Sequence, residues 1–122
     1  ERAYIVLPSK DEIELIAGKS FKEAAKLLLG LGISIVAVKL GEKGCYVTDG
    51  KEEYFIEAFR VKVVDTTGAG DAFDAGFLYG LLKGKDLYDC GRLGNFVASR
   101  CIASMGARTG LPRLSELKEA GF

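Results

Sequence analysis

The chain has 122 residues, of which 48% are hydrophobic and 28% charged, a composition typical of one globular domain and not of a disordered or low-complexity chain. Seventeen basic and seventeen acidic side chains give a formal net charge of zero, so overall charge does not favour nucleic acid or an anionic membrane as a partner. The absence of histidine excludes His-based triads and His-containing zinc signatures. Carboxylates and backbone amides must therefore supply any chemistry.

The three cysteines, Cys45, Cys90 and Cys101, form no C-x-x-C pair, which favours buried core thiols in a reducing compartment over a disulfide framework. The first apolar run, residues 3–7, is too short for a signal peptide or a membrane span. We therefore expect a cytoplasmic protein with no membrane partner. The chain opens on Glu1 inside an expected strand, so we also expect a missing N-terminal portion, which could carry a surface for homo-oligomers.

The first third of the chain predicts a β-α-β unit. Residues 4–7 are typical of the end of a buried strand, and Ser9 and Glu12 after them form the S-x-x-E pattern of a capping box, which predicts a short helix. A second capping pair opens an amphipathic helix over residues 20–29. The β-branched run 33–38 is typical of a parallel strand covered on both faces.

The remaining elements complete an α/β domain that spans residues 1–122. They are an antiparallel hairpin (45–48 and 53–56), a short strand (61–64), a helix with a stripe of small residues (69–82), a second helix (87–104) and a short helix after Pro112. We expect a mainly parallel sheet with helices on both faces and the hairpin at one side. A ligand would bind at the carboxyl ends of the parallel strands.

A strand that ends in glycines and opens a helix forms the candidate site. Gly68 and Gly70 lack a Cβ atom, so the backbone N–H groups and the positive end of the helix dipole can approach an anion such as phosphate. No G-x-x-x-x-G-K-[ST] motif is present, and Phe73 stands where a dinucleotide fingerprint needs glycine. Both of those phosphate loops are therefore excluded.

Asp71 follows these glycines in the first turn of the expected helix. It can be a capping or dipole-compensating residue. A carboxylate inside a phosphate cradle repels the ligand, however, unless a substrate hydroxyl sits between the two. Asp71 would then accept the hydroxyl proton while the glycine N–H groups stabilise the transferring phosphoryl group, as in a kinase.

The segment VVDTTGAGDAFDAGF resembles the C-terminal signature of the ribokinase-like (PfkB) carbohydrate kinase family. VAVKLGEKG resembles the nucleotide-side loop of that family, and the stretch from Asn95 to Pro112 resembles its closing segment. The resemblance implies a ribokinase-like fold, with ATP and Mg²⁺ as the cofactors. It makes Asp71 the catalytic base and Gly68, Ala69 and Gly70 the anion hole.

The same resemblance assigns the rest of the site. It implies that Lys39, Gly41 and Gly44 lie at the nucleotide phosphates and Asn95 near adenine, and that Asp65 and Thr67 hold a monovalent cation such as K⁺ beside the loop. The alternatives are a surface lysine at position 39, a solvated polar residue at 95, and a turn residue at 65 with ordinary loop hydroxyls beside it.

One motif departs from the family pattern. Ser9-Lys10-Asp11-Glu12 stands where the family usually has Asn-x-x-Glu for magnesium and phosphate, so Glu12 is retained and Asn is replaced by Ser. A capping box explains Ser9 and Glu12 equally well, and a metal-linked role for Glu12 stays one of two alternatives.

The expected function is ATP-dependent phosphorylation of a sugar hydroxyl, with a small-molecule sugar and ATP as the partners. A nucleoside kinase of the same family and a non-catalytic nucleotide-binding fragment are the alternatives. Because the residues that choose the acceptor resemble ones carried by the missing portion, we expect the isolated chain to be inactive.

Overall fold

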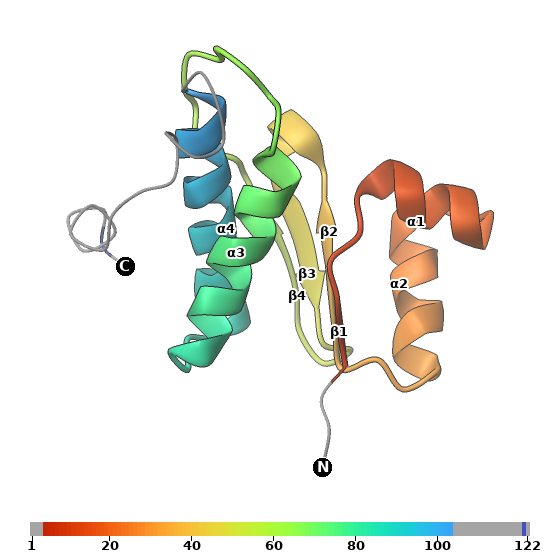
Figure 1. The fold of residues 1–122 in the computed structure, drawn as a ribbon. Helices are drawn as coiled ribbons and strands as arrows, with labels where there is room; N and C mark the ends of the chain where they lie inside the picture. The colour runs from red at the N-terminus through yellow and green to blue at the C-terminus, as the bar shows by residue number, and fades with distance from the viewer. Residues whose placement is uncertain (1–3, 104–120, 122) are drawn as a thin grey trace.

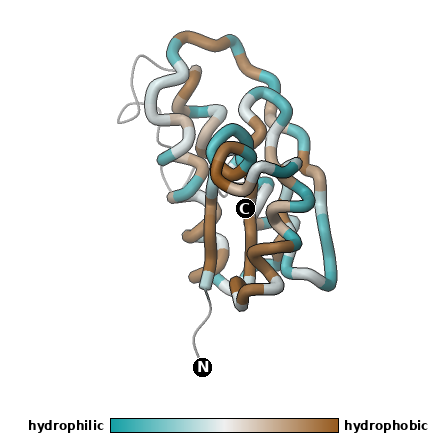
Figure 2. Tube along the Cα trace, turned by 90° about the vertical axis from the view of Figure 1, so that its right-hand side faces the viewer, coloured by the Kyte–Doolittle hydropathy of each residue, from teal (hydrophilic) through white to brown (hydrophobic). Residues whose placement is uncertain are grey.

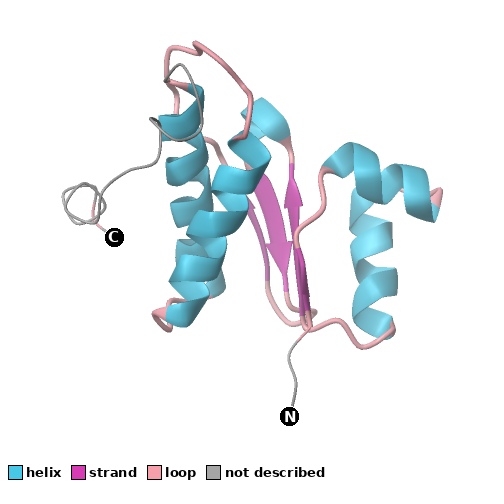
Figure 3. Ribbon diagram, in the orientation of Figure 1, coloured by secondary structure: helices cyan, strands magenta, loops and turns pink. Residues whose placement is uncertain are grey.

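The computed structural model describes residues 4–103 and 121, which form a four-stranded sheet between two pairs of helices (Figures 1 and 3). The strands lie in the order β1 (Ile5–Val6), β2 (Ile35–Lys39), β3 (Cys45–Thr48) and β4 (Glu53–Ile56). The helices are α1 (Lys10–Ala17), α2 (Phe21–Gly30), α3 (Ala69–Leu82) and α4 (Leu87–Ile102), and η1 (Gly41–Lys43) is a single 3₁₀ turn. The expected α/β class, with helices on both faces, is confirmed.

Helices α1 and α2 begin at the predicted serine caps. Ser9 Oγ accepts a hydrogen bond from the Glu12 N–H at 3.2 Å, and Glu12 Oε1 accepts one from the Ser9 N–H at 2.9 Å. Ser20 Oγ accepts the N–H of Glu23 in the same way at the start of α2. Each cap satisfies an N–H group that has no partner inside the helix.

The sheet buries side chains on both of its faces, as the run 33–38 predicts. Val36 and Val38 of β2 pack with Ile13, Ala24 and Ala25 of the helices α1 and α2. Between these two valines, Ala37 points to the opposite face and packs in a separate cluster with Phe73 and Phe77 of α3 and Cys90 of α4. Successive strand residues alternate between the faces, so both pairs of helices share one sheet.

The stripe of small residues on α3 allows that helix to lie close to α4. A Cβ atom at Gly76 would come within 2.9 Å of the Leu93 carbonyl oxygen, and one at Gly80 within 2.9 Å of Cys90 Sγ. The small residues of this stripe therefore let the backbones of α3 and α4 approach closely. This packing fixes the direction of α3 and the position of its N-terminus.

Two expectations differ from the structure. The described sheet is mixed and not mainly parallel: β1 and β2 pair in parallel, whereas β2–β3 and β3–β4 are antiparallel. Residues 61–64 form no strand but an exposed arch between β4 and α3, which is the hydrophobic stretch at the top of Figure 2.

The last residues of the arch are tied to a helix end. The N–H groups of Val64 and Asp65 both donate to the Ile102 carbonyl oxygen, at 2.7 and 3.1 Å. The carbonyl groups at the end of a helix lack partners within the helix, so α4 supplies the acceptor that a strand would otherwise provide. The expected helix after Pro112 lies outside the described residues.

Among the described residues, no helix combines the length and the apolar character needed to cross a membrane.

Candidate active site

A cavity of about 1300 Å³ lies at the end of the molecule where β2 ends and α3 begins, the upper end in Figure 1. Its walls come from the start of α1, the β2–η1–β3 connection, the segment after β4 and the facing sides of α3 and α4. Most of the predicted site residues line it: Glu12, Lys39, Gly41, Gly44, Ala69, Gly70, Asp71 and Asn95. Gly68, Asp65 and Thr67 belong to the loop that leads into α3 but do not line the cavity.

The N-terminus of α3 is built differently from those of the other helices. Its N-cap is Gly68, in the left-handed conformation at φ 80°, and no side chain caps it. The N–H groups of a first helical turn have no intrahelical acceptor, and Ala69, Gly70 and Asp71 of this turn line the cavity. The arrangement can bind an anion through backbone N–H groups and the helix dipole.

Asp71 is exposed at this N-terminus and faces the cavity from the first turn. An acidic residue there compensates the helix dipole. The same position lets the carboxylate accept a proton from a hydroxyl group that approaches the N–H groups. Dipole compensation and a catalytic role are therefore both compatible with its position.

Lys39, the last residue of β2, forms an ion pair with Asp74 of α3. Its Nζ lies 3.0 Å from Oδ1 and 3.2 Å from Oδ2, and the lysine side chain is 18% exposed. Lys39 therefore lies at a strand end, as the alternative expects, but it is largely buried and paired, and its role at the phosphates stays a prediction. Asp74 is one turn after Asp71, and no local sequence pattern indicates its pairing with Lys39, 35 residues away.

Gly41 and Gly44 shape the turn after β2. Both have positive φ, 63° and 105°, which glycine adopts without strain. A Cβ atom at Gly44 would overlap the Ile56 carbonyl oxygen, so β3 can start directly against the end of β4 only with glycine there. These two residues therefore set the shape of one cavity wall.

Asn95 is a buried residue of α4, 4% exposed, so the alternative of a solvated polar residue is wrong. Its amide nitrogen donates to the carbonyl oxygens of Ile56 and Glu57, both at 3.0 Å. Asn95 thereby holds the chain where it leaves β4, and it lines the cavity from that position. No sequence pattern indicated this bond, because its partners are backbone groups about 39 residues away.

Glu12 has the capping role that its motif predicts, and it also lines the cavity. Hydrogen bonds from the backbone and side chain of Ser9 lower the pKa of this carboxyl group, with a further contribution from the charge of Lys39. It is therefore a carboxylate that a metal-bound phosphate could approach. Within the described part of the chain, no cluster of three His, Cys, Asp or Glu side chains is arranged to hold a metal ion.

Asp65 and Thr67 form a local turn. Asp65 Oδ1 accepts the N–H of Thr67 at 2.8 Å, and this bond lowers the pKa of the Asp65 carboxyl group. Cys101 Sγ lies 3.3 Å from the Thr67 carbonyl oxygen and donates to it. The turn alternative therefore accounts for Asp65, and its role at a cation stays a prediction.

The three cysteines are buried free thiols, as expected. Burial raises the pKa of Cys45 to about 12 and that of Cys90 to about 11, so neither is a thiolate near neutral pH.

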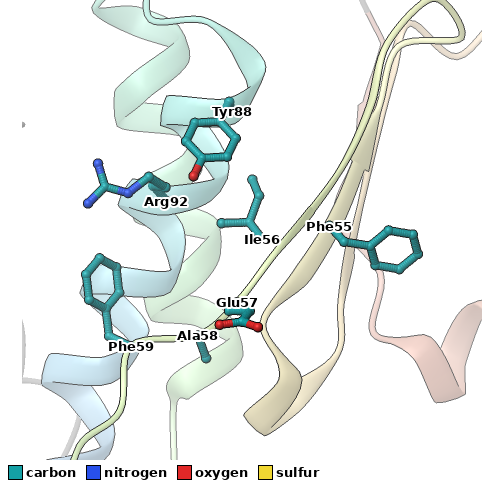
Figure 4. Close-up of a pocket in the computed structure, with 7 residues that line it drawn as sticks. All are labelled: Phe55, Ile56, Glu57, Ala58, Phe59, Tyr88 and Arg92. Atoms are coloured by element: carbon teal, nitrogen blue, oxygen red, sulfur yellow. The ribbon is translucent and has the colours of Figure 1, made fainter.

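A smaller cavity of about 460 Å³ lies between the end of β4 and α4 (Figure 4). The guanidinium carbon of Arg92 lies 5.7 Å from the centre of the Phe59 ring. Figure 4 shows Phe55 pointing away from these two residues. No predicted site residue lines this cavity. The ionisable side chains in its lining are Glu57, Tyr88 and Arg92.

The family model described as pfkB family carbohydrate kinase matches residues 1–114. An uncharacterized sugar kinase of Archaeoglobus fulgidus is 57% identical over 109 residues, which cover 89% of this chain and 44% of that protein. The chain thus spans less than half the length of this relative.

Solved structures of kinases have the same fold. The probable sugar kinase of Rhizobium etli superimposes with a TM-score of 0.87 at 40% identity, over 97% of this chain and 36% of that one. The adenosine kinase of Sinorhizobium meliloti gives 0.85 at 33% identity, over 97% and 36%. A Vibrio cholerae fructokinase with fructose, ADP and calcium bound gives 0.83 at 31% identity, over 94% and 40%. The fold is therefore ribokinase-like, and the chain belongs to the pfkB family of carbohydrate kinases.

Proposed function

We propose that this chain supplies the nucleotide-binding and catalytic part of an ATP-dependent sugar kinase. The observation that carries the proposal is that Asp71, the uncapped N-terminus of α3 and the Lys39–Gly44 turn line one cavity. One site would then hold the phosphates of the donor, an anion-binding helix end and a carboxylate base. The family membership and the sugar kinase relative support the same reaction.

In the proposed reaction, Asp71 orients the acceptor hydroxyl and takes its proton. The hydroxyl oxygen forms a bond to the γ-phosphorus atom as the bond to the bridging oxygen of ADP breaks. Because the transition state is loose, proton transfer to the carboxylate comes late. The N–H groups at the start of α3, in the segment Gly68–Gly70, stabilise the charge on the phosphoryl oxygens during transfer.

The remaining cavity residues would hold the nucleotide. The Lys39 ammonium group and the turn from Gly41 to Gly44 face the phosphates, and the wall at Asn95 is the place for adenine. Magnesium neutralises phosphate charge when it is bound with the nucleotide. Since Mg²⁺ commonly uses one or two carboxylates together with substrate phosphates, a single carboxylate at Glu12 fits that role.

The acceptor would bind mainly to residues outside this chain. The chain covers 36 to 44% of the matched proteins described above, so we infer a longer protein in which a preceding portion completes the acceptor pocket. We call this longer protein the complete kinase. A nucleoside acceptor is the second candidate, because the adenosine kinase of Sinorhizobium meliloti has the same fold at 33% identity.

An acceptor panel tests this proposal. The complete kinase, supplied with ATP and magnesium, should phosphorylate a sugar in preference to any nucleoside, measured as ADP release and as phosphorylated product. Preference for a nucleoside would replace the sugar assignment. Absence of transfer to every acceptor, with ATP still bound, would favour the non-catalytic alternative.

The isolated chain provides a second test. Purified residues 1–122 should transfer no phosphate to any sugar, because the acceptor pocket is incomplete. Turnover by this chain, free of contaminating kinase, would show that the acceptor site lies within these residues.

A salt titration tests the proposed cation site. If Asp65 and Thr67 help to hold K⁺ beside the loop, the rate of the complete kinase should rise with KCl relative to choline chloride at equal ionic strength. An equal rate in both salts would leave Asp65 with its turn role alone.

A further inference from the structure

The Lys39–Asp74 ion pair joins the end of β2 to the first turns of α3. Both carboxylate oxygens of Asp74 lie within 3.2 Å of Lys39 Nζ, so the ammonium group is held by two of its three possible hydrogen bonds. The lysine side chain is 18% exposed and that of Asp74 is 31% exposed. The pair is thus partly shielded from water. Its electrostatic attraction is therefore weakened less than that of a fully exposed pair.

The two partners differ in their relation to the cavity. Lys39 lines it, together with Gly70 and Asp71, whereas Asp74 is absent from its lining. A ligand in the cavity therefore meets the ammonium group and not the carboxylate. An ion pair arranged in this way can hold the lysine without occupying the place of the ligand.

The position of the ammonium group is unfavourable for a lysine alone. Lys39 Nζ lies 3.6 Å from the point where a Cβ atom of Gly70 would be, so it lies against the first turn of α3. That turn carries the positive end of the helix dipole, which repels a cation. Asp71 compensates part of this dipole, and Glu12 adds a charge attraction. Among the described residues, Asp74 is the carboxylate that forms an ion pair with Lys39.

We propose that Asp74 is a positioning residue, which holds the Lys39 ammonium group over the N-terminus of α3 so that it meets the phosphates of the nucleotide. The inference rests on the proposed function for the identity of the ligand. Lys39 provides the contact, and Asp74 acts only through Lys39. Without Asp74, the dipole and the four-carbon stem of lysine let the ammonium group leave the cavity for solvent.

Direct nucleotide binding to the complete kinase tests this proposal. The variants are Asp74→Asn, Lys39→Met and the double variant, and the ligands are ATP, ADP and adenosine, measured by calorimetry. Loss of a charge-assisted contact corresponds to roughly 10- to 100-fold in affinity. Asp74→Asn should raise the Kd of ATP by about 10-fold, leave that of adenosine unchanged, and add no further loss in the Lys39→Met background.

Kinetics and a conservative variant extend the test. Asp74→Asn should raise the KM for ATP more than it lowers kcat, and Asp74→Glu, which keeps the charge, should recover part of the affinity. Glu53→Gln is the matched control: it removes the carboxylate that pairs with Lys22 at 3.4 Å outside the cavity, and it should leave ATP binding unchanged.

Three results would overturn the inference. Tighter ATP binding in Asp74→Asn would mean that Asp74 competes with the phosphates for Lys39. Equal losses for ATP and adenosine, with a lower Tm, would indicate a structural role alone. A further loss in the double variant would mean that Asp74 does not act through Lys39. A wild-type kinase that binds ATP but transfers no phosphate would contradict the proposed function and leave this binding test intact.

Discussion

The starts of the helices divide into two kinds, and the difference locates the site. Helices α1, α2 and α4 are each capped by a side chain, from Ser9, Ser20 and Asp86. Helix α3 starts at Gly68, which has no side chain to accept its N–H groups. A glycine N-cap forgoes a few tenths of a kcal/mol of stability relative to a serine or aspartate cap. The Ala69 N–H donates to the Thr66 carbonyl oxygen at 3.2 Å, and the N–H groups of the next two residues, Gly70 and Asp71, are the ones that a ligand can take. The helix end without a side-chain cap is therefore the one suited to function.

The largest effect on stability is expected when a glycine is replaced in the turn at the cavity. The turn after α2 provides the comparison. Gly44 and Gly32 have nearly equal φ, 105° and 107°, but only a Cβ atom at Gly44 would overlap backbone, that of Ile56. Gly32→Ala should cost about 1 kcal/mol from backbone strain. Gly44→Ala should cost at least about 2 kcal/mol more, because the two chain segments must also separate. Urea unfolding of both variants measures the difference, and equal costs would contradict the close approach.

Gly70→Ala should change stability and function in opposite directions. Alanine favours a helix by about 0.5 to 1 kcal/mol over glycine, and the new Cβ atom would be in ordinary contact with Lys39 Nζ, at 3.6 Å. The methyl group would project toward the N–H groups of the first turn, so the Kd of ATP should rise at least about 10-fold.

Gly30→Ala is the matched control for this variant. Gly30 is the last residue of α2, and a Cβ atom there would meet nothing within 4 Å. It should gain a similar amount of stability and leave ATP binding unchanged. Unchanged ATP binding in Gly70→Ala would show that the start of α3 does not contact the phosphates.

The smallest effect concerns a capped helix. Ser20→Ala removes the acceptor for the Glu23 N–H and should lower the free energy of unfolding by about 1 kcal/mol. Ser20 does not line the cavity, so kcat and the Kd of ATP should stay at their wild-type values. A change in nucleotide affinity would mean that the start of α2 is coupled to the cavity.

Local patterns were sufficient to predict most elements and the start of α3. The capping pairs, the Asp49-Gly50 hairpin and the glycine loop each act within a few residues, so their outcome depends little on the rest of the fold. The apolar run 61–64 forms no strand, and its last N–H group, that of Val64, finds its acceptor at Ile102, about 38 residues away in sequence. The same limit explains Asn95 and the Lys39–Asp74 pair, whose partners are brought close only by the packing of α3 and α4 on the sheet.

The central claim is that Asp71 is the catalytic base, and Asp71→Asn in the complete kinase tests it most directly. General-base catalysis typically contributes about 10²- to 10⁴-fold, so kcat should fall by that order. The Kd of ATP should stay the same or improve, because a negative charge near the phosphates is removed. Asp86→Asn is the matched control: Asp86 caps α4 outside the cavity, asparagine caps about as well, and its activity should be unchanged. A kcat close to that of wild type in Asp71→Asn, with an unchanged Tm, would leave Asp71 with dipole compensation alone and contradict the account.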